Sequence, residues 1–259
     1  MKRIATLLAL LALSAAPAFA TVLLQDSFTY ANGDLAANFP WAVYSGTPPT
    51  DIQVSAGRIL VNENNAPDDH ALFAVQGTST KTYACFDAIV ANPGGAPKPV
   101  YFFELKDNGA SNLVSRVYVL NVAGGFTFGV SHSTTSTTVG LTPWGSTLTY
   151  GTKYNVVVNY DPVNKTSTLW VNPANESSTS VSDANAAIAA LAVQGVGFRQ
   201  STTASTLPPA QTSLYAGAVN ATISVDNLGV GTTFTDACLL YQSTPAQRST
   251  WGAVKQIYR

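Results

Sequence analysis

Carboxylates, which cleave glycosidic bonds when they act in pairs, are sparse in this sequence. There are three glutamates, Glu63, Glu104 and Glu176, and a glycosidase needs two carboxyl groups that flank the bond to be cut. Glu104 and Asp107 form the nearest candidate pair, but residues three apart on a strand point to opposite faces. The segment from Asp107 to Gly109 also has the composition of a turn. The sequence therefore predicts no catalytic carboxylate pair.

Histidine and thiol chemistry are also poorly supported. Neither His70 nor His132 has the partners that a catalytic triad or a zinc site requires. Neither Cys85 nor Cys238 has a histidine or a basic residue nearby in the sequence, which argues against a catalytic thiol. We therefore expect a binding module rather than an enzyme.

One loop concentrates oxygen donors of the kind that calcium prefers. Residues 62–69 (NENNAPDD) crowd amide and carboxylate side chains together, and calcium takes six to eight oxygen ligands from such loops. Asn62, Asp68 and Asp69 are the candidate ligands. The spacing lacks the turn glycine and the closing glutamate of an EF-hand, so a solvated polar loop with Asx-turns is the alternative.

Aromatic residues are the remaining candidates for a binding site. A sugar ring stacks on Trp or Tyr, whose polar edge stays in water. Trp41, Tyr44 and Trp144 lie in loop-like segments, where binding residues tend to occur. Trp170 lies in a strand-like run and is expected in the core. Packing within the protein is the alternative for the three loop aromatics.

The two cysteines are far apart in the sequence. Cys85 lies in the strand-like run 82–90, and Cys238 follows the last expected strand. In an oxidising compartment, two cysteines can form one disulfide bond. The alternative is a pair of buried thiols that act as small apolar residues.

The elements that must hold these residues are short strands. The run 153–173 (KYNVVVNYDPVNKTSTLWVNP) alternates apolar and polar residues, turns at 161–165, and continues with β-branched and aromatic residues, which predicts a hairpin. Gly124-Gly125 indicates a second tight hairpin. Further strands are expected at 23–30, 52–54, 58–61, 70–74, 82–90, 100–106, 115–122, 126–131, 195–200, 214–216 and 222–233. Many short strands with regular turns are typical of a sandwich or a barrel, and 183–191 is the one helix-like stretch of the body, although a loop is equally compatible with it.

The order of several segments resembles the bacterial laminin-G-like, concanavalin A-like family of jelly-roll domains. The matching segments are 26–33 (DSFTYANG), 54–61 (VSAGRILV), the polar loop 62–69, 102–108 (FFELKDN), 116–119 (RVYV), 169–173 (LWVNP) and 224–232 (SVDNLGVGT). This resemblance implies an all-β fold, a two-sheet antiparallel jelly-roll sandwich. It does not identify a function, because the fold serves lectins, adhesion modules, hydrolases and lyases. The strand motifs that mark the hydrolases and the lyases of the family are absent from the sequence.

Both ends of the chain differ from the body. Residues 1–20 have a basic start, an apolar run and an Ala-Phe-Ala cleavage site, which is typical of a signal peptide. The apolar run is too short to cross a bilayer, and no later segment could do so. We expect the sandwich over 21–237 and a linker with a short amphipathic helix over 238–259. Trp251, Val254 and Tyr258 share one face of that helix, which is too short to be stable alone, so it docks on the sandwich or a partner or stays disordered.

Composition limits the partners. The formal net charge is −1 and charged residues make up 10% of the chain, without the basic stripe that nucleic acid or anionic lipid would require. We expect an exported protein, extracellular, periplasmic or on the cell surface, that binds a glycan or an extracellular protein, or mediates adhesion. The alternatives are a polysaccharide-active enzyme with an unrecognised site and a structural component of an extracellular assembly.

Overall fold

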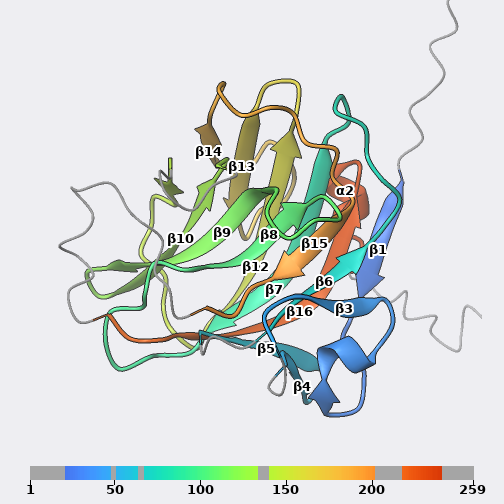
Figure 1. Cartoon of the computed structure of the whole chain (residues 1–259). Coiled ribbons are helices and arrows are strands. Elements are labelled where there is room, and N and C mark those ends of the chain that lie inside the picture. Colours follow the sequence, from blue (N-terminus) through green and yellow to red (C-terminus); the bar gives the residue numbers. More distant parts are fainter. Residues whose placement is uncertain (1–20, 48–50, 64–66, 134–139, 202–217, 241–259) are drawn as a thin grey trace, which may run out of the picture.

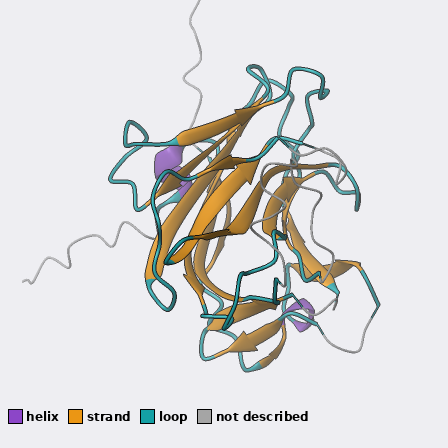
Figure 2. Cartoon of the chain, turned by 90° about the vertical axis from the view of Figure 1, so that its left-hand side faces the viewer, coloured by secondary structure: helices purple, strands orange, loops and turns teal. Residues whose placement is uncertain are grey.

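The computed structural model describes residues 21–47, 51–63, 67–133, 140–201 and 218–240. They form two antiparallel sheets packed face to face (Figure 1). Within these residues, helix is confined to two short segments that lie far apart, η1 (Leu35–Ala37) and α2 (Phe234–Ala237) (Figure 2). The predicted all-β sandwich is therefore confirmed.

The larger sheet has nine strands. Their order is β14-β13-β12-β7-β16-β5-β4-β2, and β1 also pairs with β16. The bounds are β1 (Val22–Asp26), β2 (Gly33–Asp34), β4 (Gln53–Ser55), β5 (Arg58–Asn62), β7 (Thr82–Val90), β12 (Lys153–Asp161), β13 (Thr166–Val171), β14 (Val181–Ala184) and β16 (Thr222–Gly231).

The smaller sheet has seven strands in the order β11-β10-β9-β8-β15-β6-β3. Strand β15 comes late in the chain but lies between β6 and β8, which brings three distant segments together. The bounds are β3 (Trp41–Ser45), β6 (Asp68–Leu72), β8 (Tyr101–Lys106), β9 (Leu113–Val122), β10 (Gly125–Ser131), β11 (Thr142–Pro143) and β15 (Gly195–Phe198).

The predicted hairpin is formed by β12 and β13, with Val156 paired to Val171. The Asp161 carboxylate accepts hydrogen bonds from the backbone N–H of Val163 (3.1 Å) and Asn164 (3.0 Å), as expected of an Asp that begins a turn. The second predicted hairpin, β9–β10, is also present.

Aromatic side chains fill the space between the sheets. Phe86 of the larger sheet contacts Phe103 of the smaller sheet, with ring centroids 4.7 Å apart, and Phe198 lies 5.5 Å from Phe103 at a steep angle. Such tilted contacts add to the free energy gained by burying apolar area. The core thereby holds the smaller sheet with one face inward, and its other face is left to carry a site.

A second, smaller cluster covers the outer face of the larger sheet beside α2. Trp170 is buried and packs against Phe234, with ring centroids 5.8 Å apart, which confirms the expected structural role of this tryptophan. Cys85 of β7 is bonded to Cys238, 153 residues later in the sequence. The predicted disulfide is confirmed, and it fastens the end of α2 to the centre of the sheet.

The stretch 183–191, expected as a helix or a loop, has its first two residues in β14 and is neither helix nor strand beyond them. Two other local predictions were wrong. The segment around Trp41 is strand β3 rather than a loop. The first strand ends at Asp26, because the Asp26 carboxylate accepts a hydrogen bond from the backbone N–H of Phe28, whose φ is 50°.

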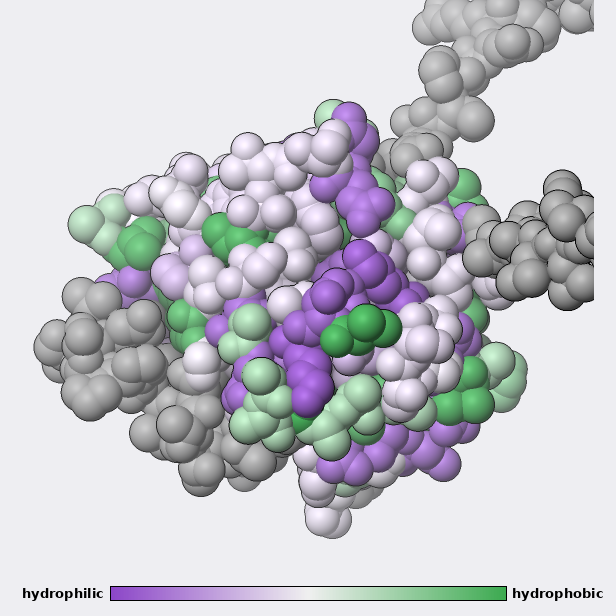
Figure 3. All heavy atoms as spheres, turned by 90° about the horizontal axis from the view of Figure 1, so that it is seen from above, coloured by the Kyte–Doolittle hydropathy of each residue, from purple (hydrophilic) through white to green (hydrophobic). Residues whose placement is uncertain are grey.

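Other predictions fall outside the described residues: the strand at 214–216, and the helical turn with Trp251, Val254 and Tyr258. No helix in the described part of the chain is long and apolar enough to span a membrane. On the face seen from above, apolar residues lie singly or in small groups among hydrophilic ones (Figure 3), which is ordinary for a protein surface.

Candidate functional site

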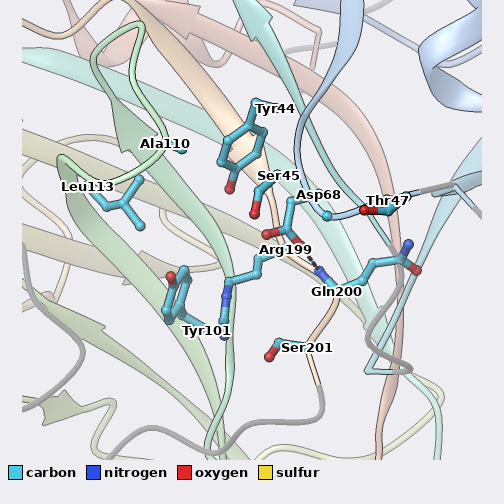
Figure 4. Close-up of a pocket in the computed structure, with 11 residues that line it drawn as sticks. Tyr44, Ser45, Thr47, Asp68, Tyr101, Ala110, Leu113, Arg199, Gln200 and Ser201 are labelled. Atoms are coloured by element: carbon cyan, nitrogen blue, oxygen red, sulfur yellow. Dashed lines mark hydrogen bonds between the residues drawn. The ribbon is translucent and has the colours of Figure 1, made fainter.

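A polar pocket of about 610 Å³ lies on the outer face of the smaller sheet. Its walls come from the end of β3, the start of β6, β8 and β9, the β8–β9 loop and the residues after β15, so segments that are far apart in the sequence converge there (Figure 4). The lining residues are Tyr44, Ser45, Gly46, Thr47, Asp68, Tyr101, Ala110, Leu113, Arg199, Gln200 and Ser201.

Strand alternation places the charged residues on this face. His70 on β6 and Glu104 on β8 are both in register with Gly197 on β15, the strand between them. A side chain at Gly197 would overlap the Glu104 carboxylate and lie 3.2 Å from the Tyr44 hydroxyl oxygen. The glycine therefore leaves the room in which Tyr44 and Glu104 meet.

Four side chains beneath the pocket form what we call the polar cluster: Tyr44, His70, Glu104 and Lys106. The Tyr44 hydroxyl donates a hydrogen bond to Glu104 Oε1. Its ring stacks on His70 with centroids 5.1 Å apart, and Lys106 Nζ lies 4.5 Å from the Tyr44 ring centroid and 3.0 Å from His70 Nδ1. Tyr44 thus contacts all three of the other members, so the cluster holds Tyr44 in one position at the pocket wall.

Burial shifts the acid–base properties of this cluster. Glu104 and Lys106 are both 0% exposed, and burial raises the pKa of Glu104 and lowers that of Lys106. Burial, followed by the nearby Lys106 charge, lowers the pKa of His70 to about 4. At neutral pH His70 is therefore uncharged and can accept a hydrogen bond from the lysine.

Asp68 is the carboxylate that reaches the pocket. Burial and the nearby Glu104 raise its pKa to about 7, so it exchanges a proton near neutral pH. Asp68 Oδ1 accepts a hydrogen bond from the backbone N–H of Gln200 at 2.8 Å (Figure 4). The Gln200 side chain is held in turn by the backbone of Asn62 (3.0 Å) and Pro67 (3.1 Å). This wall of the pocket is therefore preorganised.

Two arginines pack against Tyr101 at one wall of the pocket. The guanidinium of Arg199 is 4.4 Å from the centroid of the Tyr101 ring, and that of Arg116 is 4.9 Å from the same ring. Cation–π contacts of this kind hold a guanidinium in place. In Figure 4 the Arg199 side chain extends from the strand end toward Tyr101.

The three aromatic candidates from the sequence do not converge. Tyr44 lines the pocket, but Trp41 is 3% exposed, and its indole N–H donates to Asp26 Oδ2 at 2.6 Å. Trp41 also packs between Phe28 and Phe198, so it offers no ring face to a ligand and is a core residue. Trp144 follows β11 at the opposite edge of the smaller sheet from β3 and packs against the core.

The three candidate calcium ligands are separated as well. Asp68 faces the pocket, whereas its neighbour Asp69 points to the other face of β6 and is 0% exposed. The Asn62 side chain accepts a hydrogen bond from Thr222 Oγ1 at 2.7 Å. Among the described residues, which omit 64–66, no group of three or more His, Cys, Asp or Glu side chains could hold a metal ion.

The buried position of Asp69 predicts a pH-dependent stability. Burial, with Asp51 beside it, raises the pKa of Asp69 to about 9. Between about pH 4 and 9 the folded protein keeps a proton that the unfolded chain releases, so the free energy of unfolding falls as pH rises. We expect Asp69→Asn to make this fall shallower by about 1 kcal/mol per pH unit, measured by denaturant unfolding from pH 6.5 to 8.5.

Asp161→Asn is the control of opposite sign. Burial acts to raise the Asp161 pKa, but hydrogen bonds from Asn164 and Lys81 outweigh it and lower the pKa. Asp161→Asn should therefore be less stable than the wild type across the same pH range, with an unchanged slope. An Asp69→Asn protein with the slope of the wild type would show that Asp69 is ionised in the fold.

Reasoning from the sequence missed most of this site. Glu104 and Lys106 are two charged residues at strand spacing within an otherwise apolar run, YFFELK, which is a signal for a polar cluster on one face of a buried strand. Arg199 carries no such signal, because its neighbours in the site come from β6, β8 and β9.

Comparisons with known proteins show the fold. No family model matches the sequence, and no curated protein matches it. Among solved structures, the CBM2 module of the evolved Dit of Lactobacillus casei BL23 phage J-1 is similar (8% identity, TM-score 0.52, 83% of this chain and 96% of that chain). The botulinum neurotoxin serotype C1 binding domain is similar too (7% identity, TM-score 0.52, 86% of this chain); this chain covers 52% of that structure's length.

Proposed function

We propose that this chain is an exported β-sandwich module that binds a carbohydrate in the pocket between β3 and the β8–β9 loop. The observation that carries the proposal is the lining of that pocket, in which hydroxyl, amide, carboxylate and guanidinium groups surround one space. A sugar presents many hydroxyls, and a site that binds it needs several polar groups held in fixed positions.

The rigidity of the pocket supports binding. Tyr44 is held by the polar cluster, Asp68 by the backbone of Gln200, and Arg199 by the ring of Tyr101. Preorganised groups lose little conformational entropy when a ligand binds. The likeness in fold to a CBM2 module and to a neurotoxin binding domain is compatible with a binding role.

Export is part of this proposal. The signal-peptide pattern of residues 1–20 predicts it. The disulfide between Cys85 and Cys238 supports it, because disulfides form and persist in oxidising compartments.

The pocket can be tested by filling it. Ala110 is exposed and lines the pocket, so Ala110→Trp is expected to weaken glycan binding at least about tenfold without loss of stability. Ala190 is exposed as well, and it lies outside the pocket. Ala190→Trp is the matched control, and binding should be measured on a glycan array and by calorimetry.

Trp144→Ala tests whether glycan binding occurs at the other edge of the smaller sheet. It should leave glycan binding unchanged, because Trp144 is at the edge opposite to the pocket. A protein that binds no glycan, or one whose binding survives Ala110→Trp and is lost in Trp144→Ala, contradicts the proposed site.

One observation favours a second candidate function, a polysaccharide-active enzyme. Asp68 has a pKa of about 7, faces the pocket and is electrostatically coupled to Glu104. A carboxyl group with a pKa near the working pH is suited to general acid–base catalysis. Release of shorter sugars from a bound polysaccharide, abolished in Asp68→Asn with binding retained, would establish this function instead of simple binding.

A further inference from the structure

We propose that the pocket selects a sugar that carries a carboxylate, such as a uronic acid, and that Arg199 binds this group. The inference rests on the proposed function, since it names the class of carbohydrate that the same pocket takes.

The first argument is an unused donor. Nη1 of Arg199 is buried and has no hydrogen-bond partner among the described residues, although Arg199 lines the pocket. No ion pair of Arg199 with Asp or Glu exists within the described part of the chain; the pairs found there involve Arg58, Lys81 and Lys153. A buried donor without a partner is costly. Arg199 as a whole is only partly buried and lines the pocket, so a ligand carboxylate that turns the guanidinium toward the open pocket would satisfy this donor.

The second argument is the balance of charge around the pocket. Arg199 and Arg116 flank Tyr101. The opposing carboxylates are already engaged, Asp68 with the backbone of Gln200 and Glu104 with Tyr44. Burial raises the pKa of Asp68 to about 7, which weakens its negative charge near neutral pH, whereas arginine stays charged.

The third argument concerns the kind of anion. A guanidinium binds a planar carboxylate through two parallel hydrogen bonds, and its position against the Tyr101 ring fixes the plane in which it can do so. Ser45, which lies beneath Tyr44 and beside Asp68, and Thr47 also line the pocket (Figure 4), so hydroxyl groups are present for the rest of a sugar ring. The pocket thus combines one site for a carboxylate with groups suited to a polyol.

The test compares each acidic polysaccharide with its neutral form on the purified full chain. The probes are polygalacturonate, alginate and polysialic acid, each beside its methyl ester, together with dextran and dextran sulfate. We expect at least one acidic form to bind more than tenfold tighter than its ester. Arg199→Gln should remove that preference, and Arg199→Lys should retain only part of it, because lysine cannot form the bidentate pair.

Arg58→Gln is the matched control. Arg58 lies on β5 of the other sheet, with its Nη2 atom 4.0 Å from Asp226 Oδ2. Its loss should leave the preference for the acidic form over the ester unchanged. Equal binding of acid and ester overturns the inference but leaves carbohydrate binding intact, and so does a preference that survives Arg199→Gln. Equally tight binding of dextran sulfate also overturns it, because a general attraction for anions would explain the result. A protein that binds none of the probes and no neutral glycan overturns both proposals.

Discussion

Replacing Glu104 by alanine is expected to lower the free energy of unfolding by about 3–5 kcal/mol. Glu104 is 0% exposed and accepts a hydrogen bond from Tyr44, and its charge offsets part of the cost of burying Lys106. Without it, the Tyr44 hydroxyl loses its acceptor and Lys106 loses the nearest compensating charge. Breaking a buried polar network from one side costs more than the network contributes as a whole, because the remaining groups stay buried.

Glu176 provides a matched control for this change. It also accepts a hydrogen bond from a tyrosine hydroxyl, that of Tyr83 at 2.6 Å, but it is exposed. Glu176→Ala should cost about 1 kcal/mol, since water replaces the lost partner. Glu104→Gln keeps the shape and an acceptor, so we expect it to lie between the two. Chemical denaturation measures all three; a Glu104→Ala protein no less stable than Glu176→Ala would show that the polar cluster does not hold the sheet together.

The strands could be predicted because their signals are local. The alternation and turn residues of 153–173 define the β12–β13 hairpin within one short window. The edge strands were missed because they lack such a local signal. Strand β14 forms because Val181 pairs with Leu169 across the sheet, and the alanine-rich window around it has no strand signal of its own. Propensity is weak where pairing with a distant partner decides the structure.

The site could not be predicted, because it depends on register. Gly197 matters only once β15 has been placed between β6 and β8 with Glu104 and His70 opposite it. In the sequence these residues are separated by tens of positions and look like an ordinary glycine, a lone acid and a lone histidine. Tyr44 was identified as a binding residue for its type and neighbourhood, whereas Trp41, three residues earlier, has the same signals and belongs to the core.

Removing the disulfide is expected to lower the free energy of unfolding by a similar amount, but through its effect on the unfolded chain. In the chain-entropy treatment, a bond that closes a loop of 153 residues stabilises the fold by about 5 kcal/mol, because it restricts the unfolded chain. We expect the double variant Cys85→Ala, Cys238→Ala to lose about that amount in denaturant unfolding. Reduction of the wild type under the same conditions should give an equal loss.

The folded state should change little in that variant, since contacts other than the disulfide hold α2. Phe234 packs against Trp170 and Tyr83, and the Asp236 N–H donates to Thr233 Oγ1 at 3.2 Å. The unfolded chain, in contrast, should expand and expose more surface, which steepens the dependence of stability on denaturant. A loss of stability with an unchanged slope would place the effect in the folded state, in the packing around α2. A steeper dependence of stability on denaturant would show that the bond acts on the unfolded chain. This is expected of a bond that links the centre of the larger sheet to the end of α2.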